Sequence, residues 1–587
     1  MITKPLPTFQ RLTFALILLL LASACQQNKQ PPATKSTQSI TCVPLPPKLN
    51  TAPGKDGYLT PLFAGLDVYH YAITTRSPLA QRYFNQGFLL NYGFNHAEAA
   101  RSFQEVNRID PECAMGYWGL AYVLGPNYNA PMFPDVLSAA KDAVAKAKLF
   151  SHLATDKEQA LIKAISLRYP NVKIEDPLPF YEAYANEMRQ VMNRFPFDMD
   201  IAAMTAEALL DLHPWDLWES SGDPKPWTPE IIDILEAILE QDSDHPQALH
   251  LYIHTLEASS EPKRALAAAD KLRLRIPGAG HLLHMPSHIY INTGQYHKGV
   301  LANERAVKQD SLYSTACTAA GIYKFGLIPH NWHFLAACAA LEGDGKKALY
   351  ASRFMAETTV DEAMLYDPDW FTLQHYYSIP WYIMAKFSNW DEILAEPLPD
   401  PKLVYPTAVA AYARAQAFIG TKDFEAAEKE ILTIEIAETD STIQNGTIWE
   451  INSVVDLVRI AKHVTKARLA QAKGDFIIAE SNFRVAIELE DKLNYNEPPD
   501  WFFSIRHLYG AALLEQKKYA EAVGIYHQDL QRFPSNGFAL NGLATAYRGL
   551  GKDLKAEKME AEFAAAWQWA TVELTGSIVK EKFKKMD

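Results

Sequence analysis

The sequence predicts an all-α protein, a solenoid of about eleven or twelve helix pairs. Small residues and large aromatic residues recur together at the spacing that closely packed helix pairs require. Two HxxxH motifs, His250/His254 and His284/His288, are separated by 34 residues, the length of one common helical repeat. Strand-like alternation of polar and apolar residues is absent over any useful length. These observations favour repeated helices over a mixed or all-β fold.

Composition fits a long ordered array. The chain has 587 residues, of which 48% are hydrophobic and 21% are charged, and its formal net charge is −13. A repeat array can reach this length without a larger core, because each repeat packs mainly on its neighbours. The acidic balance argues against nucleic acid as a partner.

The first 25 residues have the pattern of a targeting segment. Lys4 and Arg11 precede a compact apolar stretch from Leu12 to Leu21, too short to span a bilayer, and small residues then lead to Cys25. This segment resembles a bacterial lipoprotein signal, which implies that Cys25 is lipidated. Gln26 then implies the outer membrane, with the protein facing the periplasm. The alternative is an ordinary cleaved secretory signal.

The rest of the chain divides by composition. Residues 26–78, rich at first in Gln, Pro, Ser and Thr, are predicted to be a disordered tether and lead-in. Residues 79–570 are predicted to form the superhelix and residues 571–587 a tail. Disulfides are permitted in the predicted compartment, and the four cysteines after Cys25 allow three full pairings that the sequence does not decide.

Two segments carry the clearest repeat pattern. In the first, Tyr83, Gly87, Ala99, Phe103 and Pro111 stand where helix pairs need aromatic, small and helix-stopping residues. The same five positions recur near the C-terminus as Arg506, Gly510, Ala522, Tyr526 and Pro534.

These segments resemble the tetratricopeptide repeat (TPR) family, which implies a right-handed superhelix with a concave groove. The runs GFNHAEAARSF and HMPSHIYINTGQYH also resemble uncharacterised bacterial TPR proteins. The resemblance is specific for fold and leaves the biochemistry open, because TPR scaffolds serve many tasks.

The TPR register places a set of polar residues on the groove-lining face of first helices. Histidines from three consecutive repeats share this face, with a few carboxylates nearby. The predicted groove or ligand-binding residues are Glu207, Asp211, His250, His254, Glu257, His281, His284, His288, His330 and His333. Pro286 interrupts the register, so we expect the helix to begin near it and to leave His281 and His284 on an irregular lead-in.

The i, i+4 spacing stacks two imidazoles on one helical face, where both can reach one metal ion. We expect His250, His254, His284 and His288 to be the metal ligands if a divalent metal, zinc or iron, is bound. The motif lacks the glutamate of HExxH, so it does not indicate a metalloprotease.

Three interpretations of the histidines stay open: metal binding, recognition of a polar peptide or small molecule, and a purely structural role. The leading functional prediction is a lipid-anchored scaffold that binds a peptide or protein segment in a His-rich groove. The second is a metal-binding protein or metal-dependent enzyme. An enzyme is less favoured, because the sequence has no phosphate-binding loop, no GxSxG and no dinucleotide fingerprint.

Overall fold

The computed structural model describes residues 57–579, except for residues 173, 220, 318–322, 359 and 362. The predictions for Cys25, the signal segment and residues 26–56 therefore lie outside the described residues. Among the described residues, no helix is long and apolar enough to cross a membrane.

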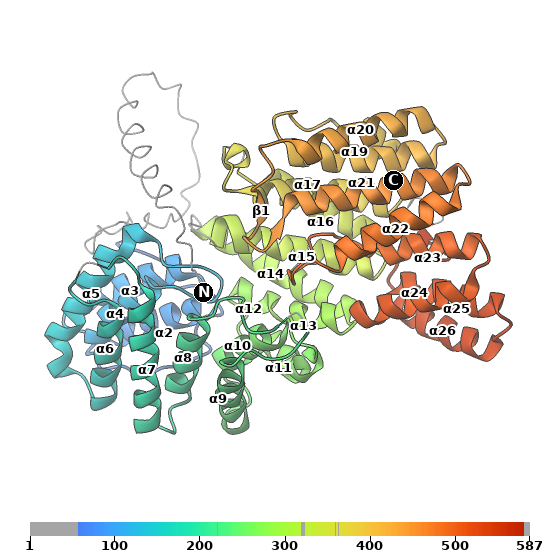
Figure 1. Cartoon of the computed structure of the whole chain (residues 1–587). Helices are drawn as coiled ribbons and strands as arrows, with labels where there is room; N and C mark the ends of the chain where they lie inside the picture. Colours follow the sequence, from blue (N-terminus) through green and yellow to red (C-terminus); the bar gives the residue numbers. More distant parts are fainter. Residues whose placement is uncertain are drawn as a thin grey trace, which may run out of the picture. The chain divides into compact units, whose positions relative to one another are not determined.

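Helices dominate the described chain (Figure 1). The helices are α2 (Pro78–Tyr92), α3 (His96–Ile109), α4 (Ala114–Val123), α5 (Leu137–Phe150), α6 (Asp156–Arg168), α7 (Leu178–Arg194), α8 (Met199–Leu210), α9 (Thr228–Gln241), α10 (Pro246–Leu256), α11 (Leu266–Leu272), α12 (Gly280–His284), α13 (Pro286–Asn292), α14 (Tyr296–Ala316), α15 (Ile328–Leu341), α16 (Gly345–Thr358), α17 (Phe371–Lys386), α18 (Trp390–Ala395), α19 (Val404–Gly420), α20 (Phe424–Thr439), α21 (Val454–Ala472), α22 (Phe476–Glu490), α23 (Ile505–Glu515), α24 (Tyr519–Arg532), α25 (Gly537–Gly549) and α26 (Asp553–Ala566).

Consecutive helices pack as pairs, and each pair packs on the next, as α2 with α3, α4 with α5, and so on to α25 with α26. The short helices α12 and α13 together form the first member of the pair that α14 completes. The predicted all-α solenoid of TPR-type helix pairs is confirmed, and so is the expected number of pairs.

Glycine and aromatic residues bring helices close together, both within a pair, as the sequence pattern indicates, and between neighbouring pairs. A Cβ added at Gly119 would lie 2.5 Å from the ring of Phe103, and one at Gly87 would lie 3.0 Å from the same ring. The turn between α2 and α3 places Phe94 at φ 54, and the side chain of Asn95 then caps α3 by accepting from the Glu98 amide.

The segments before and after the helices are ordered where the structure describes them. In the lead-in, Leu66 and Tyr71 are buried, and the Leu59 amide donates to Glu105 at 3.1 Å. After the last helix, a short hairpin of β3 (Leu574–Thr575) and β4 (Ile578–Val579) buries Val579, and a similar hairpin, β1 (Thr447–Ile448) with β2 (Asn452–Ser453), precedes α21. The described lead-in, residues 57–78, thus packs on α2 and α3.

Contacts also join repeats that are far apart in the sequence, which a simple solenoid does not require. Tyr313 donates to Glu98 at 3.1 Å, Tyr296 donates to the carbonyl of Pro534 at 2.7 Å, and the Thr571 amide donates to the carbonyl of Gly343 at 3.0 Å. The expectation that each repeat contacts mainly its neighbours is therefore incomplete.

Two large hydrophobic cores follow from this arrangement. One draws its buried residues from positions 66–327 and the other from positions 291–579. The two overlap in sequence between α13 and α15. The histidine motifs of the sequence fall at this junction.

Candidate metal centre

Six histidine rings lie side by side at the junction of the two cores. They come from α10, α12, α13 and α15, and neighbouring ring centroids are 4.7–5.9 Å apart. The six are His250, His254, His281, His284, His288 and His330. Their nitrogen atoms gather in two triads.

The first triad is His250, His254 and His281, with one nitrogen of each within 4.8 Å of the others. The Nδ1 of His254 lies 3.0 Å from a carboxyl oxygen of Glu257. When Glu257 is ionised, this oxygen can only accept, so Nδ1 carries the proton and Nε2 keeps a free lone pair. Among the described residues, His250 Nε2 and both ring nitrogens of His281 also have no hydrogen-bond partner.

The second triad is His284, His288 and His330. The Nε2 atoms of His284 and His288 are 2.7 Å apart, and those of His288 and His330 are 3.5 Å apart. Asn303 donates its amide to the carbonyl of Gly299 at 2.8 Å, so its oxygen accepts from His284 Nδ1 at 2.6 Å. This contact fixes the tautomer of His284 and turns its Nε2 lone pair toward the triad.

Two buried carboxylates lie beside the triads. The Oε2 of Glu257 is 2.9 Å from His288 Nδ1, and the Oε2 of Glu497 contacts the same nitrogen. Neither contact has the geometry of a hydrogen bond. One potential ligand atom from each of Glu257, His288 and Glu497 nevertheless lies within 4.8 Å of the other two. Because the other oxygen of Glu257 holds His254, this glutamate connects the two triads.

Aromatic rings enclose the cluster on two sides. Phe94 lies 4.7 Å from the ring of His250 and 5.3 Å from that of His281, measured between centroids. Phe334 lies 4.8 Å from His284 and 4.5 Å from His288. These rings bury the cluster, and a buried, low-dielectric site strengthens the electrostatic interactions inside it.

Burial sets the protonation of these groups. It lowers the pKa of both His254 and His284 to about 3, and it lowers the pKa of His288 well below the usual range, with the neighbouring histidines adding to the effect. Burial raises the pKa of Glu257 and Glu497, and for Glu497 the nearby Glu257 adds to the rise. The imidazoles are therefore neutral at physiological pH, as metal ligands must be.

The donor set fits a divalent cation that prefers nitrogen and oxygen. Zinc–nitrogen bonds of about 2.0–2.1 Å place ligand atoms roughly 3–4 Å apart. The Nε2 separations in the second triad, 2.7 and 3.5 Å, lie near this range, and those in the first triad are at most 4.8 Å. Glu257 contacts Nδ1 of His254, and Asn303 contacts Nδ1 of His284. Contacts of this kind commonly orient histidines that bind a metal through their other nitrogen. Zinc and iron both use such ligands.

The predicted residues divide into two groups. His250, His254, Glu257, His281, His284, His288 and His330 lie together, whereas three do not. His333 instead packs on Phe502 and lies 5.7 Å from the ring of His375. Glu207 accepts from Tyr122 and from Gln247, and Asp211 pairs with Arg168 at 3.4 Å.

The predicted groove is not open at the histidines. The side chains of His250, His254, His281, His284 and His288 are at most 1% exposed. They are covered by Phe94, by Phe334 and by the segment that carries Glu497. This burial corrects the expectation of an accessible concave surface lined by these rings.

The helix break at Pro286 is present in a milder form than the sequence suggests. α13 begins at Pro286, as expected, but His281 and His284 lie on the separate short helix α12. His281 and His288 belong to the same repeat, but they lie on the two sides of the break at Pro286 and belong to different triads.

Sequence reasoning missed Glu497, Phe94 and Asn303. Glu497 lies in the loop between α22 and α23, more than two hundred residues from His288. This loop is one of several long connections in the chain, so its length did not single out Glu497. Phe94 and Asn303 carried no signal, since both fit ordinary repeat positions.

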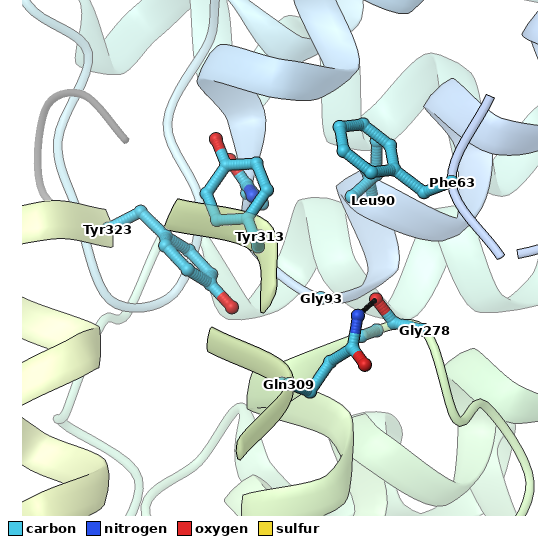
Figure 2. A pocket seen from close by; sticks show the side chains of 10 residues that line it. Phe63, Leu90, Gly93, Gly278, Gln309, Tyr313 and Tyr323 are labelled. Atoms are coloured by element: carbon cyan, nitrogen blue, oxygen red, sulfur yellow. Dashed lines mark hydrogen bonds between the residues drawn. The ribbon is translucent and has the colours of Figure 1, made fainter. Parts of the chain in front are cut away.

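A small pocket opens near the first triad, and Figure 2 shows its lining. Phe63, Leu90, Tyr313 and Tyr323 contribute side chains, and Gln309 donates to the carbonyl of Gly278 at 3.3 Å. It has room for about one water molecule. None of the candidate metal ligands lines it, although its wall residue Gly280 directly precedes His281.

No family profile and no curated protein matches the chain. Similar solved structures include the human IFIT1 dimer with m7Gppp-AAAA (13% identity, 82% of this chain and 95% of that chain, TM-score 0.33). Another is the APC/C hetero-tetramer Cut9–Hcn1 (15% identity, 83% of this chain and 73% of that chain, TM-score 0.28). A third is the P58(IPK) TPR domain (11% identity, 82% of this chain and 99% of that chain, TM-score 0.21). At these scores, no argument about function is taken from them.

Proposed function

We propose that this TPR-type scaffold binds a divalent metal at the buried histidine–carboxylate cluster. The observation that carries the proposal is the convergence of unpartnered nitrogen atoms, with two carboxylates, in a buried interior. Leaving such groups without partners costs free energy, about 1–3 kcal/mol for each unsatisfied group. A bound cation would satisfy several of them at once.

Peptide capture in this groove has less support. An extended peptide needs an accessible row of side chains, whereas these rings are covered by the protein itself. A purely structural role would call for hydrogen bonds between the rings and their neighbours. Within the part of the chain that the structure describes, His281 has no such bond at either ring nitrogen.

The test is metal analysis of the purified full chain, loaded separately with Zn²⁺ or Fe²⁺ and then desalted. We expect stoichiometric metal in the wild type and its loss from the double variant His254→Ala/His288→Ala, which removes one ligand from each triad. Loading at about a hundredfold above Kd should add about 2.7 kcal/mol to the free energy of unfolding of the wild type alone.

The matched control is His463→Ala, which removes a half-buried histidine bonded to Asn482 at 2.9 Å, outside the cluster. Its metal content should equal that of the wild type. A wild type that binds neither metal, or a double variant that binds as much as the wild type, would refute the proposal.

We also propose that Cys25 anchors the protein to the outer membrane, facing the periplasm. The support is the sequence pattern of residues 1–25. Cys25→Ser should release the protein from membranes or block its processing. Unchanged membrane association in fractionated cells would count against the anchor.

A further inference from the structure

A second polar cluster lies far along the chain from the histidine triads, on α17, α23 and α24. Lys386 is the last residue of α17, and its Nζ lies 2.7 Å from His507 Nδ1. The Nε2 of His507 lies 2.9 Å from the Oδ2 of Asp529. The three side chains form one hydrogen-bonded chain.

The direction of these hydrogen bonds follows from Asp529. Its Oδ2 also accepts from the Asn536 amide at 2.9 Å, and His507 lowers the pKa of the buried carboxyl, so Asp529 is ionised. His507 therefore donates from Nε2, and its Nδ1 holds a lone pair toward Lys386. The lysine contacts the basic nitrogen of an imidazole that a carboxylate orients.

The surroundings of Lys386 are aromatic. Its Nζ lies 3.7 Å from the ring centroid of Phe538 and 5.2 Å from that of Phe503, and His507 stacks on Phe538 at 5.1 Å. Burial lowers the pKa of Lys386 to about 7, against the opposing attraction of Asp529 and Glu490. Lys386 as a residue is nevertheless only partly buried.

A lysine with a merely structural role would pair directly with a carboxylate. Here a base stands between the amine and Asp529, in the order nucleophile, base and orienting acid. This order is the arrangement that activates nucleophiles in enzymes.

We propose that Lys386 is a nucleophilic amine, deprotonated by His507, that forms a Schiff base with an apolar aldehyde. Lys386 first gives a proton to His507 Nδ1, and Asp529 stabilises the imidazolium as a positioning residue. The free amine attacks the carbonyl carbon, and the oxygen leaves as water after taking protons from the nitrogen and from His507. The product is an imine, and no oxidant or reductant is consumed.

Trapping with benzaldehyde and cyanoborohydride tests this inference on the purified full chain at about pH 7.5. The hydride reduces the imine, so each event adds one benzyl group that peptide mass spectrometry can locate. Because its pKa lies below the usual lysine value of about 10.4, Lys386 should be labelled at least about tenfold faster than an ordinary lysine.

Lys298 is the matched control, because it lies 5.3 Å from the ring of Tyr290 but pairs directly with Asp270. His507→Gln should slow the labelling of Lys386 about tenfold, a typical contribution of a general base being at least this large, and leave Lys298 unchanged. Asp529→Asn should move the pH profile of Lys386 labelling without abolishing it. The labelling rates of Lys386 and Lys298 in the wild type, measured by peptide mass spectrometry, test the proposal even if a variant does not fold.

The inference is overturned if Lys386 in the folded wild type is labelled no faster than Lys298. It is also overturned if His507→Gln, folded by circular dichroism, reacts at Lys386 as fast as the wild type.

Discussion

A single buried histidine outside the metal centre illustrates how burial turns into pH dependence. His375 shares its Nδ1 with the hydroxyl of Tyr405 at 2.8 Å, and burial lowers its pKa to about 3. In the unfolded chain its pKa is about 6.5. Between these values the unfolded state binds more protons, so stability is complete above about pH 6.5 and falls as the pH drops toward 3.

We therefore predict that His375→Gln will flatten the acid side of the stability profile. Between pH 6 and pH 5 the wild type should lose about 1.4 kcal/mol per pH unit more than this variant, the effect of one proton. Guanidinium unfolding at the two pH values measures the difference. His152→Gln, at an exposed position, should follow the wild type, and parallel slopes for all three proteins would contradict the prediction.

The candidate ligands were predictable from the sequence only as far as they are local. The i, i+4 spacing and the 34-residue repetition bring His250, His254, His284 and His288 to one side of their helices. Which ring nitrogen is free depends on partners such as Glu257 and Asn303, and sequence spacing carries no information about them. His333 shows the limit, because one helical turn after His330 its side chain already faces another cluster.

At the scale of the element, the helix pairs depend on how closely two helices can approach. A Cβ at Gly510 would lie 2.4 Å from the ring of Tyr526, and one at Gly542 would lie 2.3 Å from the same ring. Gly524, in the middle of α24, has no atom within 4 Å of such a Cβ. This pattern was readable in the sequence because the same small and large residues recur in each repeat.

The same substitution should thus have opposite effects at two neighbouring sites. Gly510→Ala should destabilise the protein by about 1–3 kcal/mol through overpacking against Tyr526. Gly524→Ala should stabilise it by about 0.5–1 kcal/mol, because alanine is the better helix former. Thermal or denaturant unfolding reports both, and equal signs would show that Tyr526 does not limit the approach of these helices.

At the scale of the whole molecule, repeats far apart in the sequence hold one another. Asn292 donates to the hydroxyl of Tyr495 at 2.9 Å, to Glu497 at 3.2 Å and to the carbonyl of Glu257 at 3.1 Å. A periodic sequence pattern cannot predict such contacts, because each of them occurs only once in the chain. The helices could therefore be predicted from the sequence, whereas the closure of one set of repeats on another could not.

Removing that link should loosen two distant segments together. Asn292→Ala should weaken protection from hydrogen exchange around Asn292 and also in the loop of Tyr495 and Glu497, by about 1–2 kcal/mol. Asn186→Ala, at an exposed helix position, is the control. If exchange changed only next to residue 292, the repeats would behave as a simple nearest-neighbour array.

The covering of the histidines has a consequence for timing. Among the described residues, Phe94, Phe334 and the loop of Glu497 cover five of the six histidines, whereas His330 is half-buried, so a cation held by His250, His254 and His281 would leave when this cover opens locally. Its residence time is then governed by an opening rate of the protein rather than by the strength of individual metal–ligand bonds. Loading would follow the same rule, with the ion entering before the distant repeats come together.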